Sequence, residues 1–250
     1  MTYAMERPSA LFPPPGLSAL LDGGQIALFL DFDGTLVDIA HAPDAINVAD
    51  GLARRLEALS ARLTGALALV TGRSVDNLVS FTGPVQLHIA GSHGGHVITE
   101  NGSTLRDVDV LPDAVGRQMG RFARENELLY ERKAHGAALH YRAMPMLEDK
   151  ARLFAADLAR EHGLETKSGK CVIEIVRPGT NKGAAVELLC QHPPFRGATP
   201  IFIGDDVTDE DGFTAANRLG GFGIVVGDRG NTAARYRLSN VKDVHAWLNL

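Results

Sequence analysis

The chain has 250 residues, of which 45% are hydrophobic and 22% are charged, and its formal net charge is -5. This length suits one large globular domain, or a core with a smaller inserted domain. The acidic balance and the lack of a long Lys/Arg run argue against a nucleic-acid partner, and the lack of a long apolar stretch argues against a membrane span.

Residues 1–15 contain several prolines and show no periodicity, so we expect a loose tail. The same prolines interrupt any apolar segment of a secretory signal. Cys171 and Cys190 are too few for a disulfide framework and do not form a Cys-x-x-Cys pair. We therefore expect reduced thiols and a cytoplasmic protein.

The first predicted core strand is the apolar run Ile26–Leu30, which is followed directly by Asp31. Because side chains alternate along an extended backbone, Asp31 and Asp33 are expected on one side and Phe32 on the other. Gly34 then lets the chain turn sharply. Two adjacent carboxylates are tolerated when a divalent cation bridges them or when one keeps a proton, and both solutions serve catalysis.

An Asp-x-Asp-Gly segment also begins calcium-binding loops, and Asp is common where a strand becomes a turn. A calcium loop starting at Asp31 needs Gly at its sixth position and Glu at its twelfth, where this chain has Leu36 and Ala42. The calcium interpretation therefore fits poorly. On this segment alone, a catalytic pair and two acids of a turn both stay open.

Further strands and helices alternate along the chain. Leucines recur at helical spacing over residues 52–63, with Asp50 as the expected cap. A strand over 66–70 leads into a helix capped by Ser74, and a third strand follows at 85–90. This alternation predicts a doubly wound parallel sheet, the Rossmann-like α/β arrangement.

The pattern changes between residues 108 and 178. Helices and strands are expected in turn at 112–125, 136–142, 147–162 and 170–176. Their strands alternate apolar and polar positions, which is typical of an antiparallel sheet with one solvated face. We therefore expect an inserted α/β cap domain at 108–178, inside a core made of residues 16–107 and 179–250. Two buried strands, over 200–204 and 223–227, resume the parallel pattern.

Polar residues follow several of the predicted core strands. They are Asp31, Asp33, Thr71, Asp205 and Asp206. Ligands bind at the carboxyl ends of the strands in open parallel sheets, so these side chains are expected to converge. Lys182 begins a helix whose first N–H groups, with its ammonium, suit an anion. Together they predict a magnesium site beside a phosphate pocket.

This combination suggests a phosphatase mechanism. Mg²⁺ would lower the repulsion between a carboxylate and a phosphate dianion, so that Asp31 attacks phosphorus. Asp33 would protonate the leaving oxygen and then deprotonate the water that cleaves the aspartyl-phosphate. Thr71 and Lys182 would hold the transferring oxygens.

Each residue also has a structural explanation. Thr71 could simply end a strand, Lys182 could be a surface charge, and the acids after Asp206 suit the positive end of a helix. His93 and His96 flank two glycines, but two imidazoles without further ligands argue against zinc. The conjunction of several such residues favours the phosphatase.

Once these residues are assembled, the chain resembles the haloacid-dehalogenase superfamily of aspartate-nucleophile phosphatases. Its four motifs appear in order as Asp31-Phe32-Asp33-Gly34-Thr35, Thr71-Gly72-Arg73, Lys182 and Gly204-Asp205-Asp206. The chain resembles the trehalose-6-phosphate phosphatases more closely. That likeness rests on residues 204–210, Glu131-Arg132-Lys133, His140-Tyr141-Arg142 and Gly169-Lys170 through Glu174, and it covers nearly everything after the tail.

The resemblance implies a Rossmann-like core with a mobile α/β cap, and hydrolysis of trehalose 6-phosphate. It implies that Asp31 is the nucleophile and Asp33 the acid/base. The implied Mg²⁺ ligands are Asp31, the Asp33 carbonyl and Asp205, with Asp206 or Asp209 nearby. The implied substrate-binding residues are Gly72, Arg73, Lys133, His140, Arg142, Lys170 and Glu174.

Three other functions stay open at this point. The first is a phosphatase for another sugar phosphate, since the core motifs carry the reaction and the cap carries selectivity. The second is a signalling receiver domain phosphorylated on Asp, although receivers resemble a shorter single domain. The third is a catalytically silent sugar-binding protein. Separately, a solvated sheet face would also explain the polar residues of the cap. We expect a monomer or a weak oligomer.

Overall fold

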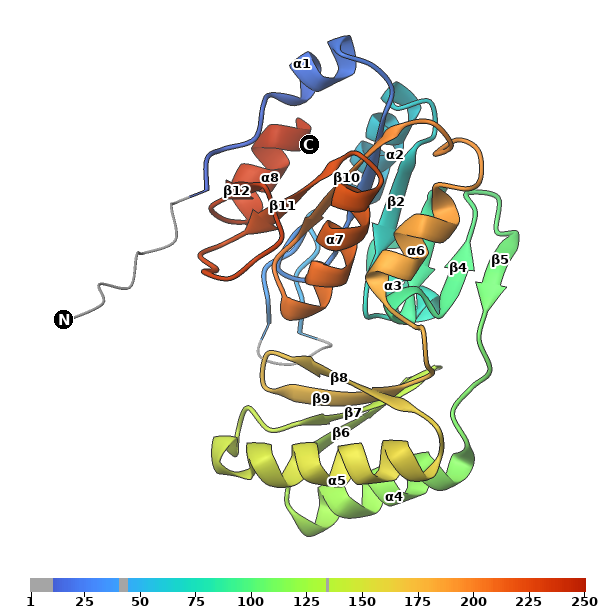
Figure 1. Ribbon diagram of the computed structural model, residues 1–250, viewed down its shortest axis with the longest axis vertical. Coiled ribbons are helices and arrows are strands. Elements are labelled where there is room, and N and C mark those ends of the chain that lie inside the picture. The colour runs from blue at the N-terminus through green and yellow to red at the C-terminus, as the bar shows by residue number, and fades with distance from the viewer. Residues whose placement is uncertain (1–10, 41–44, 134) are drawn as a thin grey trace, which may run out of the picture.

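The structure is a computed structural model that describes residues 11–40, 45–133 and 135–250. It contains an eight-stranded and a four-stranded sheet, which lie one above the other in Figure 1. The first ten residues of the predicted tail lie outside the described part of the chain. Residues 11–15 of that tail form neither helix nor strand.

The large sheet has two kinds of strand pairing. Its strands in spatial order are β12 (Tyr236–Leu238), β11 (Phe222–Val226), β10 (Thr199–Gly204), β1 (Ile26–Leu30), β2 (Leu67–Val70), β3 (His88–Gly91), β4 (His96–Ile98) and β5 (Thr104–Asp107). The six strands from β12 to β3 are parallel, which confirms the predicted parallel sheet. The hairpin of β4 and β5 extends it in the antiparallel sense.

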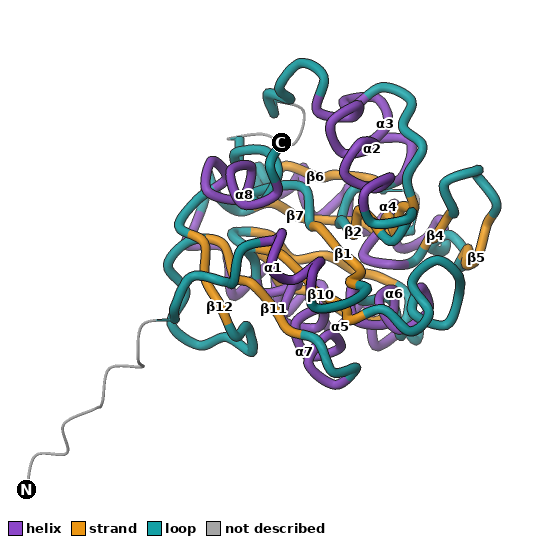
Figure 2. Tube along the Cα trace, turned by 90° about the horizontal axis from the view of Figure 1, so that it is seen from above, coloured by secondary structure: helices purple, strands orange, loops and turns teal. Residues whose placement is uncertain are grey.

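Helices cover both faces of the large sheet, as Figure 2 shows. One face packs against α1 (Leu17–Asp22), α2 (Leu52–Arg62), α3 (Val75–Thr82) and α8 (Val241–Leu248), and the other against α6 (Lys182–Leu189) and α7 (Glu210–Arg218). In β1, Leu28 and Leu30 face the first layer, while Ala27 and Phe29 face the second. A strand buried on both faces needs apolar residues throughout, which explains the unbroken run before Asp31.

The predicted caps of two helices differ in outcome. Ser74 caps α3 as predicted, since its side chain accepts a hydrogen bond of 3.2 Å from the Asn77 N–H. The prediction that Asp50 caps α2 is wrong. Gly51 precedes the helix in a left-handed conformation with φ 73°, so Asp50 lies one residue too early to reach the first turn.

The small sheet is antiparallel and lies beneath the carboxyl ends of the parallel strands. Its spatial order is β6 (Leu129–Arg132), β7 (Gly136–His140), β9 (Val172–Val176) and β8 (Glu165–Gly169). Two helices, α4 (Asp113–Glu125) and α5 (Glu148–Glu161), cover the face turned away from the large sheet. The α/β core with a smaller antiparallel cap is therefore confirmed. The edge strands β6 and β8 escaped prediction because β8 is polar throughout and β6 is a short strand with only two apolar residues.

Short 3-10 turns complete the fold: η1 (Ser92–Gly94), η2 (Pro145–Leu147) and η3 (Val207–Asp209). The first follows β3 and the third follows β10, so both lie near strand ends that face the small sheet. Over the part of the chain that the structure describes, no helix has the length and apolar character needed to span a membrane.

Candidate active site

A cavity of about 560 Å³ lies where the two sheets face each other. On the side of the large sheet it is lined by the predicted site residues Asp31, Asp33, Thr71, Gly72, Arg73, Lys182, Asp205 and Asp206. On the side of the small sheet it is lined by Glu131, Lys133, His140, Arg142 and Glu174. Two predicted site residues, Lys170 and Asp209, are not among the lining residues.

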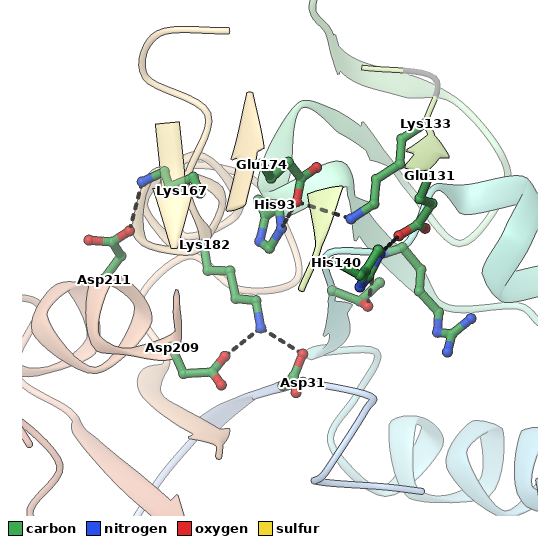
Figure 3. A network of polar contacts seen from close by, with 12 residues as sticks. Asp31, His93, Glu131, Lys133, His140, Lys167, Glu174, Lys182, Asp209 and Asp211 are labelled. Carbon is green, nitrogen blue, oxygen red and sulfur yellow. Dashed lines mark hydrogen bonds and ion pairs between the residues drawn. The ribbon is translucent and has the colours of Figure 1, made fainter. Parts of the chain in front are cut away.

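Lys182 lies buried between two carboxylates at the centre of the site (Figure 3). Its ammonium donates to Asp31 Oδ1 at 2.7 Å and to Asp209 Oδ1 at 2.5 Å. Burial alone would lower the pKa of Lys182, but the negative charges of Asp209 and Asp31 outweigh it and raise the pKa. The surface-charge explanation of Lys182 is therefore wrong.

The local backbone at three chain segments positions the residues of the site. Asn181 caps α6 by accepting a 2.7 Å hydrogen bond from the Ala184 N–H, so the helix begins at Lys182. Asp31 directly follows β1 and is buried, with 4% of the residue exposed. Gly34, with φ +81°, has no Cβ, and any Cβ at this position would overlap the Asp205 carboxylate. Only glycine therefore lets the turn after β1 approach the end of β10 this closely.

Three carboxylates cluster around this lysine. Carboxylate oxygens of Asp31, Asp205 and Asp209 all lie within 4.8 Å of one another. Burial, then the negative charge of Asp209, raises the pKa of Asp31 well above its usual range. Burial and Asp209 likewise raise the pKa of Asp205 to about 7. One ammonium does not balance three carboxylates, and oxygen ligands suit Mg²⁺, so the cluster fits a magnesium ion.

Asp33 and Asp206 lie beside this cluster without being part of it. Arg73 donates from Nε and Nη2 to the two carboxylate oxygens of Asp33, each at 2.7 Å. The Asp206 N–H donates to Asp209 Oδ2 at 2.8 Å in the turn that begins η3. Asp31 and Asp33 therefore face different cationic partners, although both line the cavity.

Thr71 and Arg73 follow β2, the second strand whose carboxyl end contributes to the site. The Thr71 side chain is buried, and its hydroxyl accepts a 3.1 Å hydrogen bond from the Arg73 N–H. Arg73 also donates to Asn77 Oδ1 at 2.8 Å, and its guanidinium lies 5.0 Å from the centre of the Phe81 ring. These contacts on α3 fix the direction from which Arg73 reaches Asp33.

Glu174 connects the small sheet to the large one. Its Oε2 accepts from Lys133 Nζ at 3.0 Å and contacts His93 Nε2 at 3.1 Å. Burial would raise the pKa of Glu174, but Lys133 and then His93 outweigh it and lower the pKa to about 2. In Figure 3, His93 approaches from the large sheet and Lys133 from the small one.

His93 is a site residue that the sequence prediction missed. A Cβ on Gly72 would come within 2.7 Å of the His93 ring, so the glycine after Thr71 leaves room for this imidazole. The available signal was the position of His93 in the glycine-rich segment that follows a core strand. The two imidazoles of that segment were considered only as zinc ligands, which the lack of further ligands argued against, and the partner of His93 lies 81 residues away.

Two further polar contacts lie on the cap side. His140 Nε2 contacts Glu131 Oε2 at 2.8 Å. Burial would raise the pKa of Glu131, but the hydrogen bond with His140 and the charge of Lys133 outweigh it and lower that pKa. Arg142 is exposed, and it donates to the Lys170 carbonyl at 3.3 Å. Lys170 is also exposed, at the turn between β8 and β9.

Comparison with known proteins gives one consistent family. The sequence model of the trehalose-phosphatase family matches residues 29–242. The trehalose-6-phosphate phosphatase of Escherichia coli is 39% identical over 242 residues, which cover 94% of this chain and 88% of that protein.

Solved structures share the fold. The C-terminal domain of the Candida albicans trehalose-6-phosphate phosphatase superposes with a TM-score of 0.80 at 23% identity, covering 97% of this chain and 99% of that one. A phosphatase of the haloalkanoate (HAD) enzyme superfamily from Bacteroides thetaiotaomicron superposes with a TM-score of 0.62 at 15% identity, covering 100% of this chain and 98% of that one.

The Glu174 ion pairs predict a pH-dependent contribution to stability. Because the pKa falls from 4.5 to about 2 on folding, ionised Glu174 contributes about 3 kcal/mol, the net of its ion pairs and the opposing effect of burial. A lowered pKa means that this contribution is complete above the unfolded-state pKa and is lost as the pH falls from about 4.5 to about 2. We expect the difference in free energy of unfolding between wild type and Glu174→Gln to shrink over that interval, measured by urea denaturation. A difference independent of pH would contradict the assignment.

Proposed function

The chain belongs to the trehalose-phosphatase family within the HAD superfamily, and we propose that it hydrolyses trehalose 6-phosphate to trehalose and inorganic phosphate. The proposed reaction depends on Mg²⁺ and passes through an aspartyl-phosphate on Asp31. One observation supports it most strongly: a single cavity joins the buried Asp31–Lys182 pair to the polar wall formed by Lys133 and Glu174.

The first step is attack of Asp31 on phosphorus. Lys182 already holds Oδ1 at 2.7 Å, whereas Oδ2, among the described residues, has only a long contact of 3.4 Å from the Thr35 hydroxyl. Oδ2 is therefore the oxygen available to the substrate. As its bond to phosphorus forms, the bond from phosphorus to the sugar oxygen breaks, which leaves an aspartyl-phosphate. Water cleaves this intermediate in a second step, so one difficult displacement is divided into two.

Asp33 would supply the proton to the departing sugar oxygen and then take one from the attacking water. Its carboxylate is engaged by Arg73 at both oxygens, so this ion pair has to open before Asp33 can carry a proton. We propose that substrate entry separates the pair and leaves Arg73 beside the substrate phosphate.

Mg²⁺, which HAD phosphatases generally use, would reduce the repulsion between the carboxylates and the phosphate. The residues that would hold it are Asp31, Asp205 and the Asp33 carbonyl, with Asp206 and Asp209 nearby. The Thr71 hydroxyl and the third N–H of Lys182 would bind the transferring phosphate oxygens, since an ammonium has three donors and two of them reach carboxylates.

We propose that residues 108–178 act as the cap, inserted into a core of residues 16–107 and 179–250, and that the cap selects the sugar. Sugar hydroxyls would bind Lys133, His140, Arg142 and Glu174, with Gly72 on the core side. Lys170 lies outside the cavity lining, so its contact with substrate requires the small sheet to move toward the site. A monomeric or weakly oligomeric state and a cytoplasmic location stay predictions.

Asp31→Asn tests the nucleophile. The amide is nearly isosteric but cannot form the same phosphoenzyme, so we expect kcat to fall at least about a thousandfold, roughly 4 kcal/mol in the barrier. Phosphate release is the measurement, and circular dichroism checks the fold. Asp22→Asn, an exposed acid at the end of α1, is the matched control and should keep full activity. Residual activity of Asp31→Asn within about tenfold of wild type would contradict the role.

The carboxylate cluster predicts that Mg²⁺ stabilises the folded chain, because an ion that binds only the folded state raises its stability. We expect the Tm to rise with Mg²⁺ concentration. Asp205→Asn should need at least about ten times more Mg²⁺ for the same rise, since it removes one charged ligand. Asp22→Asn again serves as the control. Equal Mg²⁺ dependence in wild type and Asp205→Asn would place the ion elsewhere.

A substrate panel separates trehalose 6-phosphate from other sugar phosphates. We expect kcat/KM for trehalose 6-phosphate to exceed that for glucose 6-phosphate by at least about tenfold, or about 1.4 kcal/mol of transition-state preference. Equal values would favour a broad sugar phosphatase. Failure to release phosphate from any of them with Mg²⁺ present would favour a silent sugar-binding protein.

A further inference from the structure

A second group of metal-binding side chains lies at the junction of the two sheets. His96 in β4, Asp107 at the end of β5 and His135 just before β7 each place one ligand atom within 4.8 Å of the others. Among the described residues that line the active-site cavity, none belongs to this group. It is therefore separate from the acidic cluster around Lys182.

The strand register holds two of these ligands together. His96 and Asp107 are directly paired across the antiparallel β4–β5 ladder, so their side chains lie on the same face of the hairpin. The third ligand comes from the other sheet. His135 Nε2 lies 3.4 Å from Asp107 Oδ1, and the rings of His96 and His135 are 5.8 Å apart between centroids.

His135 has an unused nitrogen in a buried position. Its side chain is 8% exposed, and its Nδ1 atom has no hydrogen-bond partner among the described residues. This Nδ1 atom is not the nitrogen that faces Asp107, so the metal ligand would be Nε2, which carries a lone pair when the neutral ring holds its proton on Nδ1.

We propose that His96, Asp107 and His135 form a binding site for a divalent transition-metal ion, with Zn²⁺ as the preferred occupant. Two imidazoles and one carboxylate suit Zn²⁺, whereas Mg²⁺ prefers oxygen ligands alone. Three protein ligands leave the fourth tetrahedral position to water. The sequence argued against zinc because His93 and His96 showed no further ligands, whereas the fold brings Asp107 and His135 to His96.

An ion at this site would join the two sheets. His96 and Asp107 belong to the large sheet, while His135 directly precedes β7 of the small sheet, so bound metal would restrict the movement of one sheet relative to the other. The site lies beside the connection after β5, where Arg177 also donates to the carbonyls of Asp109 and Val110. If the cap moves during turnover, which is part of the proposed function, bound Zn²⁺ slows the reaction.

Co²⁺ binding tests the site without relying on activity. The metal-stripped full chain, saturated with Mg²⁺ to occupy the acidic cluster, is titrated with Co²⁺ while its visible absorption is recorded. We expect one equivalent of Co²⁺ to bind with the spectrum of a nitrogen-containing site, and Zn²⁺ to displace it. His135→Gln and Asp107→Asn should each weaken binding at least about tenfold. The Asp107 side chain is 57% exposed, so its variant should fold normally.

His162→Gln, at the end of α5, is the matched control and should bind Co²⁺ like wild type. Absence of the bound equivalent, or identical Co²⁺ spectra and affinities in wild type and the ligand variants, would overturn the proposal. In turnover assays at saturating Mg²⁺, Zn²⁺ should inhibit wild type and His162→Gln but not His135→Gln. Equal inhibition of all three would overturn the bridging role. The Co²⁺ titration contains no substrate, so its result does not depend on phosphatase activity. A failure of the proposed phosphatase activity would appear only in the turnover assay.

Discussion

The buried ammonium of Lys182 is the constraint on which the site depends. It lies between Asp31 at the end of β1 and Asp209 in η3, so three segments far apart in the sequence meet at one point. A buried charge that loses its partner costs about 3–5 kcal/mol, which makes this arrangement hard to disturb without destabilising the fold. Because all three carboxylates of the cluster are held near one cation, their excess negative charge is concentrated where a metal ion and a phosphate would bind.

A second constraint is the polar character of the contact between the sheets. Each sheet packs its apolar residues against its own helices, and the small sheet has its own core cluster. Between them, the structure shows ion pairs such as His93–Glu174 and Lys167–Asp211. Polar interfaces of this kind are typical of domains that move relative to each other. The cavity thus lies where a change in the angle between the sheets alters access to Asp31 most directly.

The core residues of the site could be predicted because the strands of a parallel sheet can be recognised from their apolar runs. Every apolar run buried on both faces implies a strand, and the residue after each strand lies at the same edge, which brought Asp31, Thr71 and Asp205 together. Contacts between side chains that only the tertiary fold brings together could not be predicted in this way. The Arg73–Asp33 pair spans 40 residues and the His93–Glu174 pair spans 81, with no periodicity to reveal either. Strands β5, β6 and β8 carry few apolar residues, so their pattern resembles that of loops.

A crystal structure with Mg²⁺ and a phosphate mimic such as beryllium fluoride would show whether Asp31 is the nucleophile. We expect the mimic bonded to Asp31 Oδ2, Mg²⁺ on Asp31 and Asp205, and Lys182 still between Asp31 and Asp209. A mimic bound away from Asp31, with that carboxylate turned out of the cavity, would exclude this role.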